Sequence, residues 1–358
     1  MAEARATYNP EHDRVNAPRK QRHKDRPSGK GERKPPQARA QEPAPAEAAR
    51  RELPPRKQGK LPAERLPVIL EVEPNEDYAL LDSGDGRKLE RYGPYRIVRP
   101  EGQAIWRPAL PDREWENVDA IFTGDTDEEG MGRWRFPKAP LGETWPMQHD
   151  RIDYLGRFTS FRHVGVFPEQ ASHWRHMEEM IQSANRPVRV LNLFGYTGLA
   201  SLVAARAGAE VTHIDASKKA VGWARENQDM ARLSGKPIRW IVEDAMKFAE
   251  REARRGNGYE IVLLDPPAFG RGPKGEVWQL FEHLPMLVET CRTILSDRPL
   301  ALVLTAYSIR SSFFSIHGLV RDIFAGMGGT VESGELVIRE ASAGRALSTS
   351  LFSRWVAK

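Results

Sequence analysis

The stretch 188–194 reads VRVLNLF and is followed by Gly195-Tyr196-Thr197-Gly198 and then by LASLVAARAG. An apolar, β-branched run of this length is typical of a strand that is buried on both faces. The two glycines predict a tight turn, in which the backbone approaches a ligand before a helix begins at Leu199. This strand, turn and helix predict the first unit of a doubly wound α/β fold.

The same rhythm continues toward the C-terminus. Further strands are expected at EVTHID, IRWIVED, YEIVLLD and LALVLTAYS, and helices at SKKAVGWARENQDMARL, AMKFAEREARR and EVWQLFEHLPMLVETCRTIL. Strands separated by such helices predict a parallel sheet that is covered on both faces. After a helix around FFSIHGLVRDIF, the runs VESGELVIRE and STSLFSRWVA predict an antiparallel hairpin. We therefore expect an α/β fold whose mostly parallel sheet has an antiparallel C-terminal edge strand.

The N-terminal part differs in charge and composition. Residues 1–66 carry 17 Lys and Arg against 9 Asp and Glu, a net charge of +8, while the whole chain carries +5. Ten of the 27 prolines and only one aromatic residue, Tyr8, lie there. Such a segment buries too little apolar surface to offset its ordering entropy, which predicts a disordered basic tail. The tail acts either as a solubilising segment or as an electrostatic arm for RNA or DNA phosphates.

Residues 67–158 change to short alternating runs such as PVILEV and DYALLDSGDGRKLERY, which predict a small β-rich domain. Asp85-Gly86 is a hairpin turn signal. This region also holds tryptophans among arginines, an arrangement that could stack on unpaired bases. The alternative is that the tryptophans form the core of the domain. They are Trp106, Trp115, Trp134 and Trp145.

Composition excludes several classes. With 358 residues and a single cysteine, Cys291, the chain cannot form an intrachain disulfide, which favours a reducing compartment. No apolar stretch approaches the roughly 18–20 residues that span a bilayer, and the N-terminus has no apolar signal region. We expect a soluble, cytoplasmic protein without a membrane partner.

Acidic residues end two of the expected strands after the first. Asp215 ends EVTHID, where a carboxylate can accept hydrogen bonds from a ribose diol, and Asp244 follows IRWIVE, where it can meet an adenine amino group. Either residue could instead cap the following helix. Because ligands bind at the carboxyl ends of parallel strands, the combination favours a nucleoside site. The G-x-G-x-x-G pyrophosphate fingerprint is absent from the glycine turn, which disfavours a dinucleotide.

The fourth strand of this series ends in Asp265-Pro266-Pro267-Ala268-Phe269. Two prolines cannot continue a buried parallel strand, so the chain leaves the sheet in a rigid turn. A planar base could lie against Phe269 while its polar edge bonds to Asp265 and to the carbonyl of Pro266. The following GRGPKG segment adds positive charge where a nucleic acid backbone would pass.

Together NLFGYTG, HID, EDA and DPPAF resemble the class I S-adenosylmethionine-dependent methyltransferases, and over residues 120–358 the chain resembles the bacterial family that methylates 23S ribosomal RNA. The segment GVFPEQ at residues 165–170 is similar to the stretch with which that family closes over its cofactor. The resemblance implies a Rossmann-like methyltransferase domain at residues 159–358, S-adenosylmethionine as cofactor, and 23S rRNA or an assembling large subunit as partner. The catalytic residues it implies are Asp265, Pro266, Pro267 and Phe269. The cofactor-binding residues it implies are His163, Phe167, Gln170, Asn192, Phe194, Gly195, Tyr196, Thr197, Gly198, Asp215, Ala216, Ser217, Asp244, Ala245 and Asp265.

The chain departs from that family in two ways. Members that make 5-methylcytidine use a cysteine nucleophile after the fifth strand, because carbon 5 of cytosine does not react until a thiolate adds. Here that stretch reads Thr305-Ala306-Tyr307-Ser308, and Cys291 lies within an expected amphipathic helix. The family's N-terminal PUA domain is also not recognisable. We therefore expect methylation of a base nitrogen without a cysteine nucleophile.

Other functions stay open at this level. The chain could be a nucleotide-dependent oxidoreductase, an RNA-binding protein that keeps a cofactor pocket without turnover, or a methyltransferase for amino groups of DNA or protein. A metal site at His173-Trp174-Arg175-His176 is disfavoured, because the histidines are not spaced i, i+4 and no carboxylate or cysteine completes a ligand set.

Overall fold

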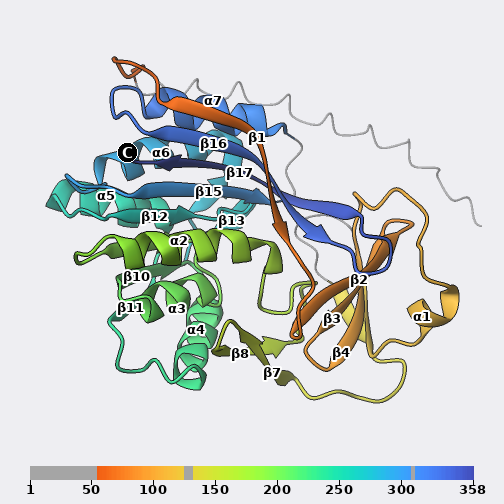
Figure 1. The fold of residues 1–358 in the computed structure, drawn as a ribbon. Coiled ribbons are helices and arrows are strands. Elements are labelled where there is room, and N and C mark those ends of the chain that lie inside the picture. Colours follow the sequence, from red (N-terminus) through yellow and green to blue (C-terminus); the bar gives the residue numbers. More distant parts are fainter. Residues whose placement is uncertain (1–54, 125–131, 308–310) are drawn as a thin grey trace, which may run out of the picture. The chain divides into compact units, whose positions relative to one another are not determined.

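The computed structural model describes residues 55–124, 132–307 and 311–358, and its main sheet has eight strands (Figure 1). Their order across the sheet is β1 (Ala63–Val72), β16 (Thr330–Arg339), β17 (Ala346–Val356), β15 (Ala301–Tyr307), β12 (Ile261–Leu264), β9 (Arg189–Leu193), β10 (Glu210–Asp215) and β11 (Ile238–Val242). Strand β17 runs antiparallel to both of its neighbours, and all other neighbouring pairs are parallel. The predicted α/β class, mostly parallel sheet and C-terminal hairpin are confirmed.

Helices cover both faces of this sheet, and successive residues of the central strands point alternately into two apolar cores. On one face α2 (Ala171–Ser183) and α3 (Leu199–Arg206) pack on Val190, Ile261 and Val303. On the other face α5 (Ala245–Arg255), α6 (Leu280–Thr293) and α7 (Phe313–Ile323) pack on Leu191, Val262 and Leu304. Helix α4 (Lys218–Met230) lies beside β10 and β11. Because helices cover both faces of the sheet, a ligand can reach the central strands only at their ends.

Strand β9 marks the place where the strand order reverses. It pairs with β10 on one side and with β12 on the other, and the chain reaches these strands through helices on opposite faces. At such a switch point the loops after neighbouring strands separate and leave a crevice at the carboxyl ends. The crevice here lies between the loop after β9, the end of β10 and the turn after β12.

One predicted helix begins later than expected. The segment EVWQLFEHLPMLVETCRTIL was expected to be helical throughout, but α6 starts at Leu280. Residues before it form strand β14 (Val277–Gln279), which pairs antiparallel with β13 (Phe269–Arg271). The reason is that Trp278 is buried, which holds this short segment as a strand against the loop after β9.

The predicted boundary between tail and β-rich domain at residue 66 is wrong, because it divides β1. Residues of β1 pair in parallel with β16, from Ala63 opposite Thr330 to Val72 opposite Ile338, so the strand extends the main sheet. The pairing joins segments more than 250 residues apart, a contact that no local pattern reveals. The predicted disorder of residues 1–54 lies outside the described residues.

The β-rich region forms a second sheet, and the predicted hairpin turn is confirmed. Its strands are β2 (Tyr78–Gly84), β3 (Arg87–Tyr92), β4 (Tyr95–Pro100), β5 (Ala120–Gly124) and β6 (Gly132–Arg135), with a short helix α1 (Asp112–Glu116) between β4 and β5. Asp85 and Gly86, at φ of 50° and 72°, join β2 to β3. Trp115 and Trp145 are buried and Trp106 and Trp134 are half-buried, which favours the core interpretation of the tryptophans.

A separate hairpin, β7 (Thr144–His149) and β8 (Ile152–Arg157), attaches to the methyltransferase-like part of the fold. The backbone N–H of Leu155 donates to Oδ1 of Asn227 at 2.9 Å, and the indole N–H of Trp223 donates to the carbonyl of Leu155 at 3.1 Å. Both partners belong to α4. This hairpin therefore bridges the two regions that the predicted boundary at residue 158 separates.

Buried charges fix the β-rich sheet to the carboxyl end of β15. Arg99 of β4 pairs with Glu90 at 2.7 Å and donates to the carbonyl of Arg162 at 3.0 Å. Arg162 in turn donates to the hydroxyl of Tyr307, the last residue of β15, at 2.9 Å. Because a buried charge is tolerated only when it is paired and hydrogen-bonded, this network holds the β-rich sheet in one position beside the crevice.

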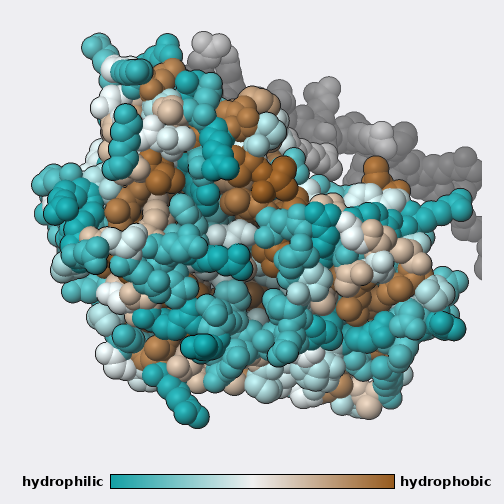
Figure 2. Space-filling model, viewed as in Figure 1, coloured by the Kyte–Doolittle hydropathy of each residue, from teal (hydrophilic) through white to brown (hydrophobic). Residues whose placement is uncertain are grey.

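On the face drawn in Figure 2, hydrophilic residues predominate and hydrophobic ones gather along the course of β1. Over the three ranges that the structure covers, no helix is both long and apolar enough to cross a membrane.

Candidate active site

The loop after β9 has an unusual backbone. Phe194 and Tyr196 adopt positive φ angles of 59° and 50°, and Gly198 adopts 83° where α3 begins. Side-chain-bearing residues seldom occupy this region, and such residues cluster at functional sites. At Gly195 an added Cβ would lie 2.3 Å from Cε1 of His213, so only glycine fits. The predicted tight turn is thus present, and its backbone faces the crevice.

Asp215, at the end of β10, holds this loop in place. Its Oδ2 accepts a hydrogen bond from the backbone N–H of Tyr196 at 2.9 Å, and its Oδ1 accepts one from Ser217 at 2.8 Å. Burial raises the pKa of Asp215, and the two backbone N–H groups act against that rise. Each carboxylate oxygen can accept a further hydrogen bond, so Asp215 can bind a diol while it holds the loop.

Asp244 caps a helix in this structure. Its Oδ1 accepts a hydrogen bond from the backbone N–H of Lys247 at 3.0 Å, at the start of α5. This is the alternative that the sequence left open for a carboxylate after a strand. Its predicted contact with adenine stays a prediction, as do the contacts of Ala216, Ser217 and Ala245.

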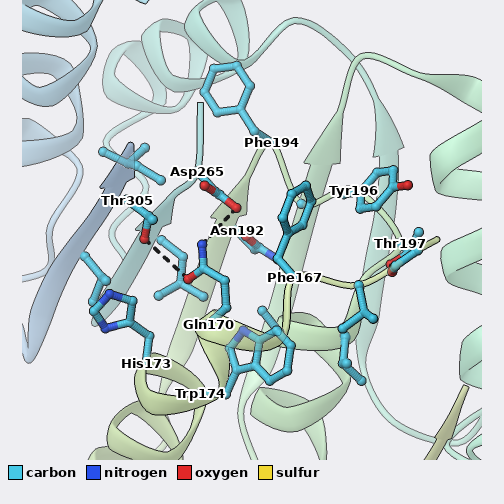
Figure 3. A pocket seen from close by; sticks show the side chains of 18 residues that line it. Phe167, Gln170, His173, Trp174, Asn192, Phe194, Tyr196, Thr197, Asp265 and Thr305 are labelled. Atoms are coloured by element: carbon cyan, nitrogen blue, oxygen red, sulfur yellow. Dashed lines mark hydrogen bonds between the residues drawn. The ribbon is translucent and has the colours of Figure 1, made fainter. Parts of the chain in front are cut away.

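Asp265 follows β12 and faces the segment before α2 (Figure 3). The side-chain amide of Gln170, in the 3₁₀ turn η1 (Pro168–Gln170), donates to Oδ2 of Asp265 at 3.0 Å. The hydroxyl of Thr305 donates to Oε1 of Gln170 at 3.3 Å. Burial, together with the nearby charge of Glu169, raises the pKa of Asp265 to about 7, while the Gln170 hydrogen bond opposes the rise. Asp265 can therefore exchange a proton near neutral pH, which is typical of functional carboxylates.

Beyond Asp265 the chain leaves the sheet as predicted. Pro266 is buried, and the carbonyl of Pro267 accepts a hydrogen bond from the indole N–H of Trp278 at 2.7 Å. Phe269 follows with 39% of its surface exposed. The turn thus carries a carboxylate at its start and an exposed aromatic residue four positions later.

A cavity lies between these elements. Eight of the predicted residues line it: Phe167, Gln170, Asn192, Phe194, Gly195, Tyr196, Thr197 and Asp265. Figure 3 shows them projecting from the segment before α2, from β9 and its loop, and from the end of β12. Residues separated by nearly 100 positions in the sequence therefore meet in one place.

His163 does not line this cavity. Its ring packs behind Phe167, with centroids 4.6 Å apart, and against Tyr307 at 5.5 Å. Burial and the charges of Arg99 and Arg162 lower the pKa of His163 well below its usual value, so the imidazole is neutral. His163 supports Phe167 from behind, and a direct contact with cofactor stays a prediction.

The other predicted residues also lie outside the lining of the cavity. They are Gly198, Asp215, Ala216, Ser217, Asp244, Ala245, Pro266, Pro267 and Phe269. Sequence reasoning missed three polar or aromatic residues that do line it: His173, Trp174 and Thr305. Thr305 had a signal, since it lies in the stretch 305–308 that the resemblance matched to the family's cysteine position. The sequence contained no signal for His173 and Trp174, because they belong to the buried face of α2 and follow the same helical pattern as its core residues.

In the parts of the chain that the structure describes, no three His, Cys, Asp or Glu side chains gather in a way that could hold a metal ion. The residues fit S-adenosylmethionine instead. At Gly195 the loop after β9 has no side chain, so the backbone can approach a ligand closely. The carboxylate of Asp215 can accept further hydrogen bonds from a ribose. The cavity between Phe167 and Asp265 is lined by both apolar and polar groups.

Comparisons with known proteins identify related sequences and structures. Residues 168–296 match the family described as Conserved hypothetical protein 95. The chain is 36% identical to a ribosomal RNA large subunit methyltransferase K/L from Pseudoalteromonas translucida over 38% of this chain and 19% of that protein. It is also 36% identical to a putative ribosomal RNA large subunit methyltransferase from Methanocaldococcus jannaschii, over 31% of this chain and 28% of that protein. The chain thus spans between a sixth and three tenths of the length of the curated relatives it matches.

Solved structures match much more of the chain. A putative SAM-dependent methyltransferase from Streptococcus mutans has the same fold, with a TM-score of 0.60, 16% identity, and coverage of 78% of this chain and 75% of that one. The SAM-dependent methyltransferase from Agrobacterium tumefaciens is 64% identical, with a TM-score of 0.82 and coverage of 85% of this chain and 97% of that one. Because that relative is matched over nearly its whole length, the chain belongs to the S-adenosylmethionine-dependent methyltransferases.

Proposed function

We propose that this methyltransferase transfers a methyl group to an exocyclic amine of a base in ribosomal RNA, without a cysteine nucleophile. The observation that carries the proposal is the position of Asp265, which lines the cavity, accepts a hydrogen bond from Gln170 at 3.0 Å and has a pKa raised to about 7, in the turn that leads to the exposed Phe269. A base that stacks on Phe269 would direct its amino hydrogens to Asp265 and to the carbonyl of Pro266.

When bound, S-adenosylmethionine supplies an electrophilic methyl group on a sulfonium and leaves as the neutral thioether. Asp265 accepts a hydrogen bond from the amine, which turns the nitrogen lone pair toward the methyl carbon. As the new C–N bond forms and the S–C bond breaks, the nitrogen becomes positively charged, and its proton passes to Asp265. Because the carboxylate has a pKa near 7, it can take this proton and release it to water between turnovers.

Positioning accounts for the rest of the rate. Gln170 holds Oδ2 of Asp265 from one side, and the two prolines keep the turn rigid. Orientation of two reactants in one site contributes several kcal/mol to such transfers, on the order of 7–11 in favourable cases.

Two observations support the substrate and the absence of a cysteine nucleophile. The relatives from Pseudoalteromonas translucida and Methanocaldococcus jannaschii are named as ribosomal RNA methyltransferases. Cys291 is fully buried within α6, where burial raises the pKa of its thiol, so it is not suited to attack a base. We infer 23S rRNA or an assembling large subunit as partner and the cytoplasm as location, which also suits the single cysteine.

Transfer of labelled methyl from S-adenosylmethionine to total RNA from cells that lack this gene tests the proposal. Digestion and nucleoside analysis should place the label in one N-methylated nucleoside. Parallel reactions with DNA, with a protein mixture and with large-subunit particles identify another acceptor. Label at carbon 5 of cytosine, or label in DNA or protein but not in RNA, would contradict the proposal.

A further inference from the structure

The β13–β14 hairpin that follows the Asp265 turn has two different faces. In its antiparallel register Phe269 lies opposite Gln279, Arg271 opposite Val277, and Gly270 opposite Trp278. Directly opposed residues share a face and successive residues alternate. Phe269, Arg271, Val277 and Gln279 are therefore on one face, and Trp278 is on the other.

The Trp278 face anchors the hairpin to the active site. Trp278 is 4% exposed, its indole N–H donates to the carbonyl of Pro267 at 2.7 Å, and its ring packs against Phe194 at 5.0 Å. Pro267 belongs to the catalytic turn and Phe194 to the loop after β9. The hairpin is thus held at a fixed place beside both the cofactor loop and Asp265.

The opposite face is open and apolar. Phe269 is 39% exposed, Val277 is 45% exposed, and Phe281, at the start of α6, is 64% exposed. These three residues lie within thirteen positions of one another, although only nine large hydrophobic side chains are exposed in all the described ranges. Single exposed hydrophobic residues need no explanation, but a group beside an active site marks a binding surface.

The hairpin also carries unneutralised positive charge. The guanidinium of Arg271 lies 5.9 Å from the centre of the Phe269 ring, and Lys274 lies in the connecting turn. Glu276 is engaged by Lys247 at 2.6 Å. The backbone N–H of Lys274 donates to Oε2 of Glu276 at 2.8 Å, but within the described residues neither the Arg271 guanidinium nor the Lys274 ammonium forms an ion pair with a carboxylate. Aromatic rings next to unpaired cations suit stacked bases on a phosphate backbone, whereas a protein partner would meet an uncompensated charge.

We infer that the open face of the β13–β14 hairpin, together with Phe281, is a platform that binds unpaired nucleotides next to the methyl-accepting one. The inference rests on the proposed RNA substrate. The accepting base stacks on Phe269, at the end of the platform nearest to Asp265 along the chain, while the neighbouring bases stack on Val277 and Phe281 and their phosphates contact Arg271 and Lys274. Because Trp278 ties the hairpin to Pro267, binding of these nucleotides places the accepting base beside Asp265.

Binding of a fluorescent single-stranded RNA of twelve nucleotides to the full chain, at 50–200 mM salt, tests the platform. Each cation that contacts a phosphate contributes about 0.7 to the slope of log K against log salt. The double variant Arg271→Ala/Lys274→Ala should therefore lower the magnitude of that slope by about 1.4. The matched control Lys236→Ala/Arg239→Ala removes two exposed cations. They lie at the amino end of the edge strand β11, whereas the hairpin follows the carboxyl end of the central strand β12. The control should leave the slope unchanged.

Phe281→Ala tests the stacking part. Loss of one stacked base costs about 1–3 kcal/mol, which corresponds to roughly 5- to 150-fold weaker binding. Ile69→Ala removes an equally exposed hydrophobic side chain from β1 and should leave RNA affinity unchanged. The affinity for S-adenosylmethionine, measured by calorimetry, should stay the same in all four variants and so reports that the fold is intact.

Equal effects of the platform and control variants, or equally tight binding of duplex RNA, would overturn the platform while leaving the RNA substrate in place. Wild-type protein that neither binds nor methylates RNA, but methylates DNA or protein, would instead overturn the proposed function.

Discussion

Asp215 and Asp265 occupy equivalent places on the two sides of β9, yet their surroundings differ. Asp215 ends β10 and accepts hydrogen bonds from two backbone N–H groups, whereas Asp265 follows β12 and is bonded to one side-chain amide. Backbone donors are fixed by the fold and favour the charged form of a carboxylate. Burial raises the pKa of both carboxyls, but two backbone N–H groups oppose the rise at Asp215, whereas Asp265 has a single opposing donor and lies near the charge of Glu169, and its pKa reaches about 7.

The comparison teaches how one sheet edge supports two tasks. A carboxylate held by backbone N–H groups stays in one place and serves to bind a ligand. A buried carboxylate with little support can gain or lose a proton at neutral pH and serves in proton transfer. The difference arises from the loops, because the two strands themselves have the same direction and the same partner.

The largest expected effect is on turnover. Asp265→Asn keeps the acceptor for Gln170 but cannot take a proton, so kcat should fall by about 10²- to 10⁴-fold. The affinity for S-adenosylmethionine should change by no more than a few fold, measured by calorimetry on the same preparation. A loss of cofactor affinity as large as that of an Asp215 variant would remove the distinction between the two carboxylates.

The next effect is on cofactor binding. Asp215→Ala removes a charged acceptor for the ribose and also releases the backbone N–H groups of Tyr196 and Ser217. Hydrogen bonds to a charged group contribute about 1.5–3 kcal/mol, so the Kd for S-adenosylmethionine should rise roughly 10- to 100-fold. At saturating cofactor, kcat should fall far less than in the Asp265 variant. Isothermal titration and steady-state kinetics together separate these effects, and an unchanged Kd would exclude a ribose contact.

A third prediction concerns pH. The raised pKa of Asp265 means that the carboxylate is largely protonated below about pH 7 and ionised above it. Since only the ionised form accepts a proton from the amine, kcat/KM should rise about tenfold per pH unit below pH 7 and level off above it. Asp265→Asn should lose this dependence. A flat profile in the wild type would indicate a ring nitrogen as acceptor, because its free lone pair needs no base.

The raised pKa of Asp265 also affects stability, and stability changes with pH in the opposite direction to activity. Between the ordinary Asp pKa and about 7, the folded state binds a proton at Asp265 that the unfolded state has lost. The contribution of this group to the free energy of unfolding therefore decreases as pH rises through that window. The raised pKa thus lowers stability at neutral pH and, at the same pH, allows the carboxylate to exchange protons.

The sequence predicted the elements that depend on local patterns. The strands at β9, β10, β12 and β15 are apolar runs rich in β-branched residues, and Pro266 and Pro267 mark the end of β12. The turn at Gly195 was predicted because two glycines after a strand permit a tight turn in which the backbone approaches a ligand. These features gave the fold class, whereas the eight predicted residues that line the cavity came from the resemblance to the methyltransferases.

What the sequence could not show depends on contacts between distant residues. Strand β1 joins β16, and Gln170 reaches Asp265 across 95 positions, contacts that no local periodicity encodes. Strand β14 was included in the helix expected from Glu276, because it is three residues long and too short for a period of two to be recognised. The raised pKa of Asp265 follows from burial, which only the assembled fold determines.

A smaller effect tests the single donor to Asp265. The amide of Gln170 favours the ionised form of Asp265, so Gln170→Ala should raise the pKa of that carboxyl further and move the pH midpoint of kcat/KM upward by about one unit. Gln170→Glu replaces the donor by an acceptor with a possible second charge and should move the midpoint at least as far. A midpoint that falls in Gln170→Ala would show that the amide does not act on Asp265.

The smallest effect is expected at Thr305, which is hydrogen-bonded to Gln170 and not to Asp265. Thr305 donates to Gln170 at 3.3 Å, a long hydrogen bond that orients the amide but does not touch Asp265. Thr305→Val keeps the shape of the side chain and removes the hydroxyl, so the pH midpoint should move upward by only a few tenths of a unit, in the same direction as in Gln170→Ala. In the double variant with Gln170→Ala, the second change should add nothing, because Thr305 acts on Asp265 only through Gln170. Additive shifts in the two variants would mean that Thr305 reaches the carboxylate by another route, and the difference between Asp265 and Asp215 would then not depend on a single donor.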